Sequence, residues 1–303
     1  MKSPSNVQLA IVLSIGILAV SLAAVLIRLA TNSAGGSGVA FSLVLAASRL
    51  SIAALILVPT WRTFRKPQSS ALTFAIFAGL ALAIHFATWI SSLSYTSIAA
   101  STTLVTTNPI WVALLSWKWF GEKPTKITFI GIAITVVGGI VIGLDNTSGD
   151  GSDPLLGNGL AIVGAWAASL YFLLGREAQR QGLSTGNYVL VAYSAAAIAL
   201  LPLPFFAGGS YLGYPLITYV YIALMAVFPQ LIGHTSFNWA VRYLPATLVT
   251  LIILLEPIGS TVLACLIFRE IPGIRVLIGA IVLLLGVAVA VVGNSSRKSI
   301  EPS

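Results

Sequence analysis

Residues 247–268 read TLVTLIILLEPIGSTVLACLIF, an apolar run long enough to cross a bilayer, with one carboxylate, Glu256, near its centre. A charged side chain in the hydrocarbon is costly, so an ionisable residue at this depth is a candidate for function. Pro257 follows it directly. Because proline has no amide hydrogen and displaces the carbonyl four residues back, here that of Ile253, we expect a kinked helix at this point.

The rest of the chain has the same apolar character. Of its 303 residues, 57% are hydrophobic and 8% are charged, whereas soluble domains carry roughly 25% charged residues. Ten stretches approach the ~20 residues that cross a membrane, and only short connectors separate them. The expected fold class is all-α and integral to the membrane, with ten transmembrane helices at approximately 8–30, 38–59, 71–93, 98–118, 126–144, 157–178, 187–207, 215–240, 246–268 and 274–293.

The distribution of charge predicts the orientation of the chain. With the N-terminus in the cytoplasm, 12 of the 16 Lys and Arg fall on the inside, as the positive-inside rule requires. The stretch LDNTSGDGSD at 144–153 carries acidic residues and no basic ones, which fits an outer loop. We therefore expect a multi-pass protein of the plasma (bacterial inner) membrane with both termini in the cytoplasm. A nucleic-acid partner is not expected, despite the net charge of +8.

An internal repeat runs through the chain. Residues 95–124, YTSIAASTTLVTTNPIWVALLSWKWFGEKP, align with residues 243–272, YLPATLVTLIILLEPIGSTVLACLIFREIP, at a constant offset of 148. Each repeat holds five spans, an odd number, so the second repeat enters the membrane from the opposite side. We expect two inverted five-helix units, 1–148 and 149–303, with a substrate site between them near the midplane. Matched positions include Arg28 and Arg176, Pro109 and Pro257, Glu122 and Glu270, Pro124 and Pro272, Gly131 and Gly279, and Gly138 and Gly286.

The same blocks carry a family resemblance that covers essentially the whole chain. N-P-I…F-G-E-K-P and L-E-P-I…F-x-E-I-P, each followed by two spaced glycines, resemble the two EamA-type repeats of the drug/metabolite transporter superfamily, as do Arg49 and RYLPAT at 242–247. The resemblance implies ten helices and the export or exchange of small metabolites, often amino acids, by alternating access. It also implies a central cavity lined by spans 1, 3, 4, 6, 8 and 9, with spans 5 and 10 at the periphery.

Glu256 and Asn108 are repeat mates, and each precedes a proline that we expect to kink its helix, Pro257 and Pro109. A kink can expose backbone polar groups to a cavity, so both side chains are candidates for its lining. Glu256 would bind a cationic group of the substrate or a proton. The alternative is a structural role at a kinked helix, and for Asn108 that alternative is favoured.

Two polar stripes lie on repeat-related helices. His85 and Trp89 are four residues apart and share one face of the third span. Gln230, His234 and Asn238 recur every four residues on the eighth span. Both stripes predict a cavity wall. The alternatives are hydrogen bonding between helices, worth ~0.6 kcal/mol per contact, and an interfacial anchor for Trp89.

Two further side chains are weaker candidates. Trp166 of the sixth span could form an aromatic wall of the cavity, with simple packing as its alternative. Arg49, in the middle of the second span, could pair with Glu256, but we expect it to bond helix-end carbonyls and hold the bundle together.

Gly139 and Gly143 form a G-x-x-x-G pattern typical of close helix packing.

Other chemistry finds little support in the sequence. GLSTG at 182–186 matches G-x-S-x-G, but it lies in a short loop between spans rather than in a strand–turn–helix unit. There is no P-loop, the single cysteine allows no cysteine-rich metal site, and no cofactor is expected. We therefore expect a secondary transporter rather than an enzyme, with a small-molecule substrate, lipid contacts and protons as a candidate coupling ion. A polytopic membrane enzyme and a non-transporting sensor or scaffold are the alternatives, and the oligomeric state is left open.

Overall fold

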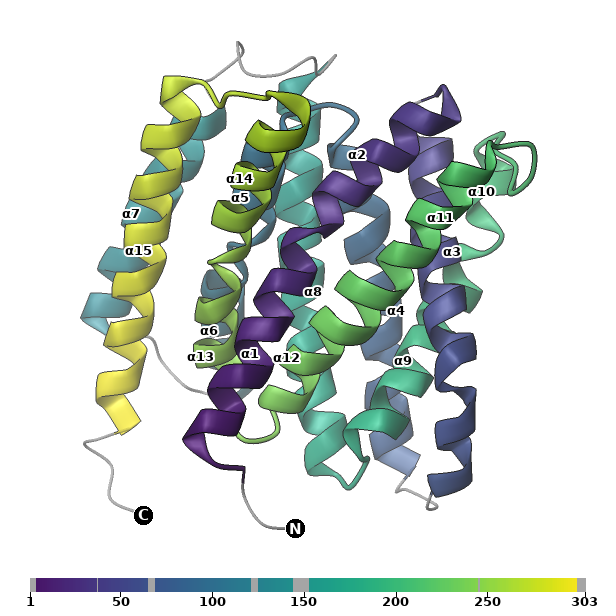
Figure 1. The fold of residues 1–303 in the computed structure, drawn as a ribbon. Coiled ribbons are helices and arrows are strands. Elements are labelled where there is room, and N and C mark those ends of the chain that lie inside the picture. Colours follow the sequence, from purple (N-terminus) through teal and green to yellow (C-terminus); the bar gives the residue numbers. More distant parts are fainter. Residues whose placement is uncertain are drawn as a thin grey trace.

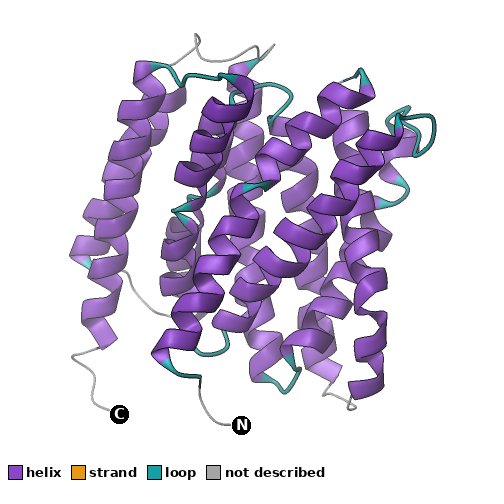
Figure 2. Ribbon diagram, viewed as in Figure 1, coloured by secondary structure: helices purple, strands orange, loops and turns teal. Residues whose placement is uncertain are grey.

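The computed structural model describes residues 4–36, 38–64, 69–120, 125–143, 153–244 and 246–298. Within these ranges all regular structure is helical, with no strand (Figure 2). The helices form one upright bundle, and α1 (Asn6–Ser21) begins at the end of the bundle where α15 (Ile274–Lys298) finishes (Figure 1). The expected all-helical fold class is confirmed.

The helices follow the expected spans, although several spans consist of two or three pieces. The first half holds α1, α2 (Ala23–Ala34), α3 (Val39–Leu57), η1 (Val58–Thr63), α4 (Ser69–Ser92), α5 (Ile98–Val105), α6 (Asn108–Phe120) and α7 (Lys126–Gly143). The second half holds α8 (Pro154–Arg180), α9 (Thr185–Leu200), α10 (Leu203–Phe206), α11 (Leu216–Met225), the π-helix η2 (Ala226–His234), α12 (Thr235–Ala240), α13 (Ala246–Ile253), α14 (Glu256–Phe268) and α15.

Among the described residues, seven helical stretches are long and apolar enough to cross a membrane. The other three expected spans contain shorter apolar helices, Lys126–Ile142, Glu256–Phe268 and Ile274–Ala290. The count of ten spans therefore stays a prediction. The clearest difference is the ninth span, 246–268, because the chain leaves helical geometry between α13 and α14.

The outside of the bundle is apolar and its interior contains polar groups. Large apolar side chains such as Leu266 and Ile281 are exposed, whereas the side chains of Arg49, Gln230 and Asn238 are fully buried. A soluble protein shows the opposite distribution. A lipid environment favours the distribution seen here, because apolar side chains can face the hydrocarbon and an intramembrane polar group must face protein or a cavity.

Both repeats interrupt a helix at equivalent positions. α5 ends at Val105 and α6 begins at Asn108, while α13 ends at Ile253 and α14 begins at Glu256. Each ending residue lies four positions before a proline, Pro109 or Pro257. The proline therefore sits in the first turn of the second helix, where no amide donor is needed.

The two peripheral helices, α7 and α15, run antiparallel along one edge of the bundle (Figure 1). A Cβ placed on Gly138 would lie 2.8 Å from the carbonyl oxygen of Gly279, and one on Gly279 would lie 2.9 Å from that of Gly138. Thr135 of α7 and its repeat mate Leu283 of α15 are also in contact, because the Thr135 hydroxyl donates to the Leu283 carbonyl at 3.5 Å.

The G-x-x-x-G pattern does not make this close contact. A Cβ on Gly139 would meet only the Leu104 side chain, at 3.8 Å, which is an ordinary packing distance. Gly139 faces away from α15 because the helix turns by ~100° per residue. Some of the predicted features lie outside the described residues. They are Glu122 and Pro124, the repeat mates of Glu270 and Pro272, and the acidic stretch at 144–152.

Candidate functional site

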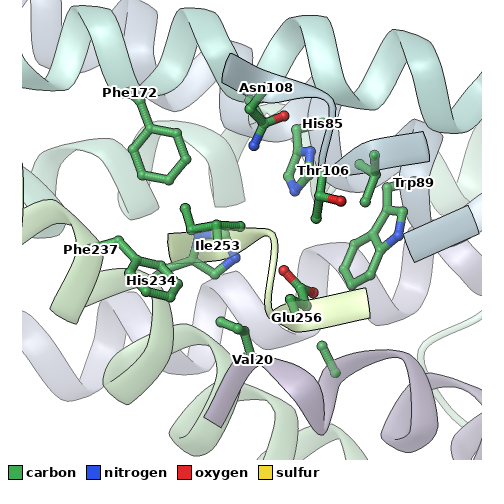
Figure 3. A pocket seen from close by; sticks show the side chains of 13 residues that line it. Val20, His85, Trp89, Thr106, Asn108, Phe172, His234, Phe237, Ile253 and Glu256 are labelled. Carbon is green, nitrogen blue, oxygen red and sulfur yellow. The ribbon is translucent and has the colours of Figure 1, made fainter. Parts of the chain in front are cut away.

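The centre of the bundle contains a small cavity, of about 30 Å³, between the two interrupted helices (Figure 3). Its walls come from α1 and α2, α4, the α5–α6 break, α8, η2 and α12, and the α13–α14 break. These are the six spans that the family resemblance implies, with α7 and α15 outside them. Its more polar wall consists of His85, Trp89, Thr106, Asn108, His234 and Glu256, and seven apolar side chains complete it.

Asn108 repairs the break in its own helix. Pro109 cannot donate to the carbonyl of Val105, which would otherwise be its helical partner. With its amide nitrogen turned toward this carbonyl, Asn108 donates to Val105 at 2.8 Å and to the carbonyl of Ala165 on α8 at 3.1 Å. The Ser169 hydroxyl on α8 in turn donates to the backbone carbonyl of Asn108 at 3.2 Å. Asn108 thus combines a structural role with a place in the cavity wall.

Glu256 occupies the corresponding position in the second repeat, but its chemistry differs. Its side chain is 8% exposed and points into the cavity (Figure 3). An ionised carboxylate only accepts hydrogen bonds, so it cannot donate to the Ile253 carbonyl as Asn108 donates to that of Val105. Only the protonated carboxyl could do so. Both repeats therefore have a helix break at this position, but only the second repeat has a side chain there that can exchange a proton, Glu256.

His85 and His234 face one another across the cavity, with ring centroids 6.2 Å apart. The Nδ1 atom of His85 lies 2.9 Å from the carbonyl oxygen of Gly164. Because a carbonyl only accepts, Nδ1 must carry the hydrogen, and a neutral His85 keeps Nε2 as an acceptor. Trp89 stacks on the His85 ring at 5.8 Å and 11°, and its indole nitrogen has no hydrogen-bond partner among the described residues.

Gln230 and Trp166 do not line this cavity. Gln230 is buried in η2, one turn before His234, and neither atom of its side-chain amide has a partner in the described part of the chain. Trp166 is 41% exposed and faces the outside of the bundle. Asn238 is also buried away from the cavity, and its amide donates to the Tyr171 hydroxyl and to the His234 carbonyl.

Arg49 differs from the expectation that it bonds helix-end carbonyls. Its side chain is fully buried, and none of its three nitrogens has a hydrogen-bond partner among the described residues. The guanidinium lies instead over the Phe86 ring, 4.1 Å from the centroid.

Several lining residues were not singled out in the sequence. Thr106 and Ile253 could have been found, because they fall in the predicted kinks ahead of Pro109 and Pro257. Val20, Phe172 and Phe237 carry no such signal, since apolar side chains occur on every face of these helices.

A polar cavity between the interrupted helices of two repeats, enclosed in a lipid-facing bundle, is typical of membrane transporters. The chain belongs to the EamA-like transporter family, whose model matches residues 8–144 and again residues 155–292. The comparison therefore finds two family repeats in one chain, as the sequence resemblance implied.

Relatives in other organisms carry the same general description. The chain is 26% identical over 259 residues to an uncharacterized transporter of Clostridium kluyveri, covering 82% of this chain and 81% of that one. It is 27% identical over 209 residues to the uncharacterized transporter YyaM of Bacillus subtilis, covering 65% and 66% of the two chains. A solved crystal structure with 18% sequence identity superposes with a TM-score of 0.64, over 98% of this chain and all of that one, and shows the same fold.

Proposed function

We propose that this protein is a secondary transporter that exports or exchanges small metabolites, with amino acids or related amphipathic compounds as its substrates. The observation that carries the proposal is the cavity at the two helix breaks, lined by both repeats. Family membership supports the transporter class. To this class the proposal adds two points, the chemical class of the substrate and the outward direction of transport.

Access would alternate by movement of one repeat against the other. Inverted-repeat transporters expose a central site first to one side and then to the other by such rocking. The units we assign to this movement are 1–148 and 149–303.

We assign substrate contacts to the polar wall of the cavity. Glu256 would face a cationic group of the substrate or carry a proton, His85 and His234 would accept or donate hydrogen bonds, and Trp89 would supply an apolar platform. Asn108 would act mainly through the break that it stabilises. We leave Trp166 out of the site because it faces outward.

The protein would span the plasma membrane ten times with both termini in the cytoplasm. The start of α1 and the end of α15 at one end of the bundle support an even number of crossings (Figure 1). The positive-inside count supports the cytoplasmic side for that end.

Flux from proteoliposomes tests the proposal. Purified protein is reconstituted into liposomes loaded with the twenty proteinogenic L-amino acids, each isotope-labelled in a separate preparation. We expect protein-dependent efflux of a subset, which an excess of the same unlabelled amino acid outside accelerates if the protein exchanges. If no amino acid leaves faster than from protein-free liposomes, the substrate class is wrong.

A further inference from the structure

The Arg49 guanidinium is a buried cation whose hydrogen bonds are unmade. It lies midway along α3, is 0% exposed, and none of its three nitrogens has a partner among the described residues. Burying an ion without partners is strongly unfavourable. The cation–π contact of Arg49 with Phe86 offsets only part of this cost, because it makes none of the hydrogen bonds of the guanidinium. Packing therefore does not explain Arg49, and an absent anionic partner would.

A second polar group with unmade hydrogen bonds lies on the neighbouring element. Both side-chain amide atoms of Gln230 are buried and without partners in the described part of the chain. Gln230 follows Pro229 in the π-helix η2, which packs against α3. π-Helical turns often occur at functional sites. Tyr193 of α9 contacts the same turn, because its hydroxyl donates to the backbone carbonyl of Gln230 at 3.4 Å.

Arg49 lies one side chain behind the cavity. The Phe86 ring has the Arg49 guanidinium against it and the edge-on ring of His234 5.3 Å away. His234 lines the cavity, and Phe86 and Arg49 do not. Movement of the Phe86 and His234 rings, or separation of α4 from η2, would thus connect the guanidinium with the cavity.

Glu256 lies in the cavity wall, and Arg49 lies behind that wall against Phe86. They do not form an ion pair, since no Arg49 nitrogen lies within 4.0 Å of a Glu256 oxygen. A cation behind the cavity wall and an acid in the wall are therefore present without a direct ion pair between them. A molecule that carries an ammonium and a carboxylate on one carbon atom would offer each of these two groups a partner of opposite charge.

We propose that Arg49, assisted by the Gln230 amide, binds the carboxylate of the substrate, and that Glu256 faces its ammonium group. The proposal rests on the transport function above and narrows its substrate to α-amino acids with a free carboxylate. A guanidinium binds a carboxylate through two parallel hydrogen bonds, and the amide adds a third donor. A phosphate dianion fits less well, because Glu256 would repel it.

Binding of acid and amide by wild type and Arg49 variants tests the proposal. The probe is the isotope-labelled L-amino acid with the highest wild-type efflux, and its binding is measured in detergent. Three unlabelled competitors are compared: the same amino acid, its primary carboxamide, and the amine that lacks the carboxyl group. A charge-assisted hydrogen-bond pair corresponds to roughly 10–100-fold in affinity. We expect the wild type to bind the acid at least 10-fold more tightly than either analogue. Arg49→Gln should lose this preference, and Arg49→Lys should keep only part of it.

The matched control is Arg242→Gln, which removes an exposed arginine and should keep the wild-type preference. Gln230→Leu serves as a second variant if Arg49→Gln does not fold, and it should weaken binding of the acid several-fold while leaving the carboxamide unchanged. Equal binding of acid and carboxamide by the wild type overturns the proposal, as does an unchanged preference in a folded Arg49→Gln.

Failure of this proposal is distinguishable from failure of the proposed function. A wild-type protein that transports only compounds without a carboxylate is still a transporter, but Arg49 then has no anion to bind. A wild-type protein that transports nothing removes the transport function itself.

Discussion

Gly131 lies directly against Gly286 where α7 crosses α15, so closely that a Cβ on Gly131 would stand 2.5 Å from the Gly286 carbonyl oxygen. The contact is reciprocal, because a Cβ on Gly286 would stand 2.8 Å from the Gly131 carbonyl oxygen. Gly138 and Gly279 form a second reciprocal pair, and the repeat offset exchanges the two pairs. Such exchange is the mark of a two-fold axis between two copies of one surface, and it agrees with an inverted repeat.

Adding a methyl group at this crossing should destabilise the bundle. Gly131→Ala places a Cβ against the backbone of α15, which cannot move aside as a flexible side chain could. We expect a loss of ~1–3 kcal/mol, the range for overpacked cores, and a lower thermal midpoint in detergent. Gly139→Ala is the matched control on the same helix, where a Cβ meets only Leu104 at 3.8 Å. Equal midpoints for the two variants would contradict the backbone contact.

The sequence predicted which glycines are repeat mates, but not which glycines touch. The 148-residue offset pairs Gly131 with Gly279, whereas the structure places Gly131 on Gly286. Symmetry relates the members of a mate pair without bringing them together. Only the position of the axis, near Thr135 and Leu283, determines the contacts. The G-x-x-x-G pattern at Gly139 was a wrong guide for the same reason, since spacing identifies a helix face and not its neighbour.

Glu270 connects the two repeats at one end of the bundle. One of its carboxylate oxygens accepts from the Ile98 amide at 2.9 Å, in the first turn of α5, and the other lies 3.6 Å from the Arg28 guanidinium. Arg28 also donates to the carbonyl of Leu93 at 3.2 Å. One side chain thus caps a helix of the first repeat and pairs with a cation of α2.

Substitutions at Glu270 should separate these two roles. Glu270→Gln keeps an oxygen for the Ile98 amide and loses only a partly exposed ion pair, so we expect a cost of ~0–1 kcal/mol. Glu270→Ala also leaves the Ile98 amide uncapped, because the N-cap Ser97 accepts from Ala100 instead, for a further ~1–3 kcal/mol. Thermal unfolding in detergent measures the order. Glu177→Gln, which breaks the surface pair with Arg180, is the control and should change little. A Glu270→Ala variant as stable as Glu270→Gln would show that the cap does not matter.

The site was predictable only where a residue type is costly in a membrane. Glu256, His85 and His234 stood out because hydrocarbon excludes ionisable groups, and the structure brings all three to one cavity. Trp166 shows the limit, because tryptophan is tolerated against lipid, against protein or at a cavity, and its sequence position does not distinguish these environments. The role of Arg49 depends on what surrounds its guanidinium, and those neighbours, Phe86 and Tyr193, come from α4 and α9.

The two tryptophans offer a matched functional comparison. Trp89 is 2% exposed and stacks on His85 in the cavity, whereas Trp166 is 41% exposed on the outside. We expect Trp89→Ala to lower amino-acid efflux by about 10-fold or more, since aromatic contacts in a buried site are worth ~1 kcal/mol beyond their area. Trp166→Ala should stay within about two-fold of the wild type. A larger defect in Trp166→Ala would place the transport route elsewhere.

Glu256→Gln should make transport less dependent on pH. Glutamine cannot lose a proton, and its amide can donate to the freed Ile253 carbonyl as Asn108 donates to that of Val105. If substrate movement is coupled to a proton on Glu256, wild-type efflux changes with an imposed pH gradient and the variant does not respond. The groups that face this carboxylate, His85, His234 and Arg49, remain in the variant, so any pH response that persists belongs to them. Glu177→Gln is the control for removal of a carboxylate outside the cavity. Identical pH profiles for the wild type and Glu256→Gln would exclude Glu256 as the proton carrier. The remaining proposed partner of Glu256 would then be the ammonium group of the substrate.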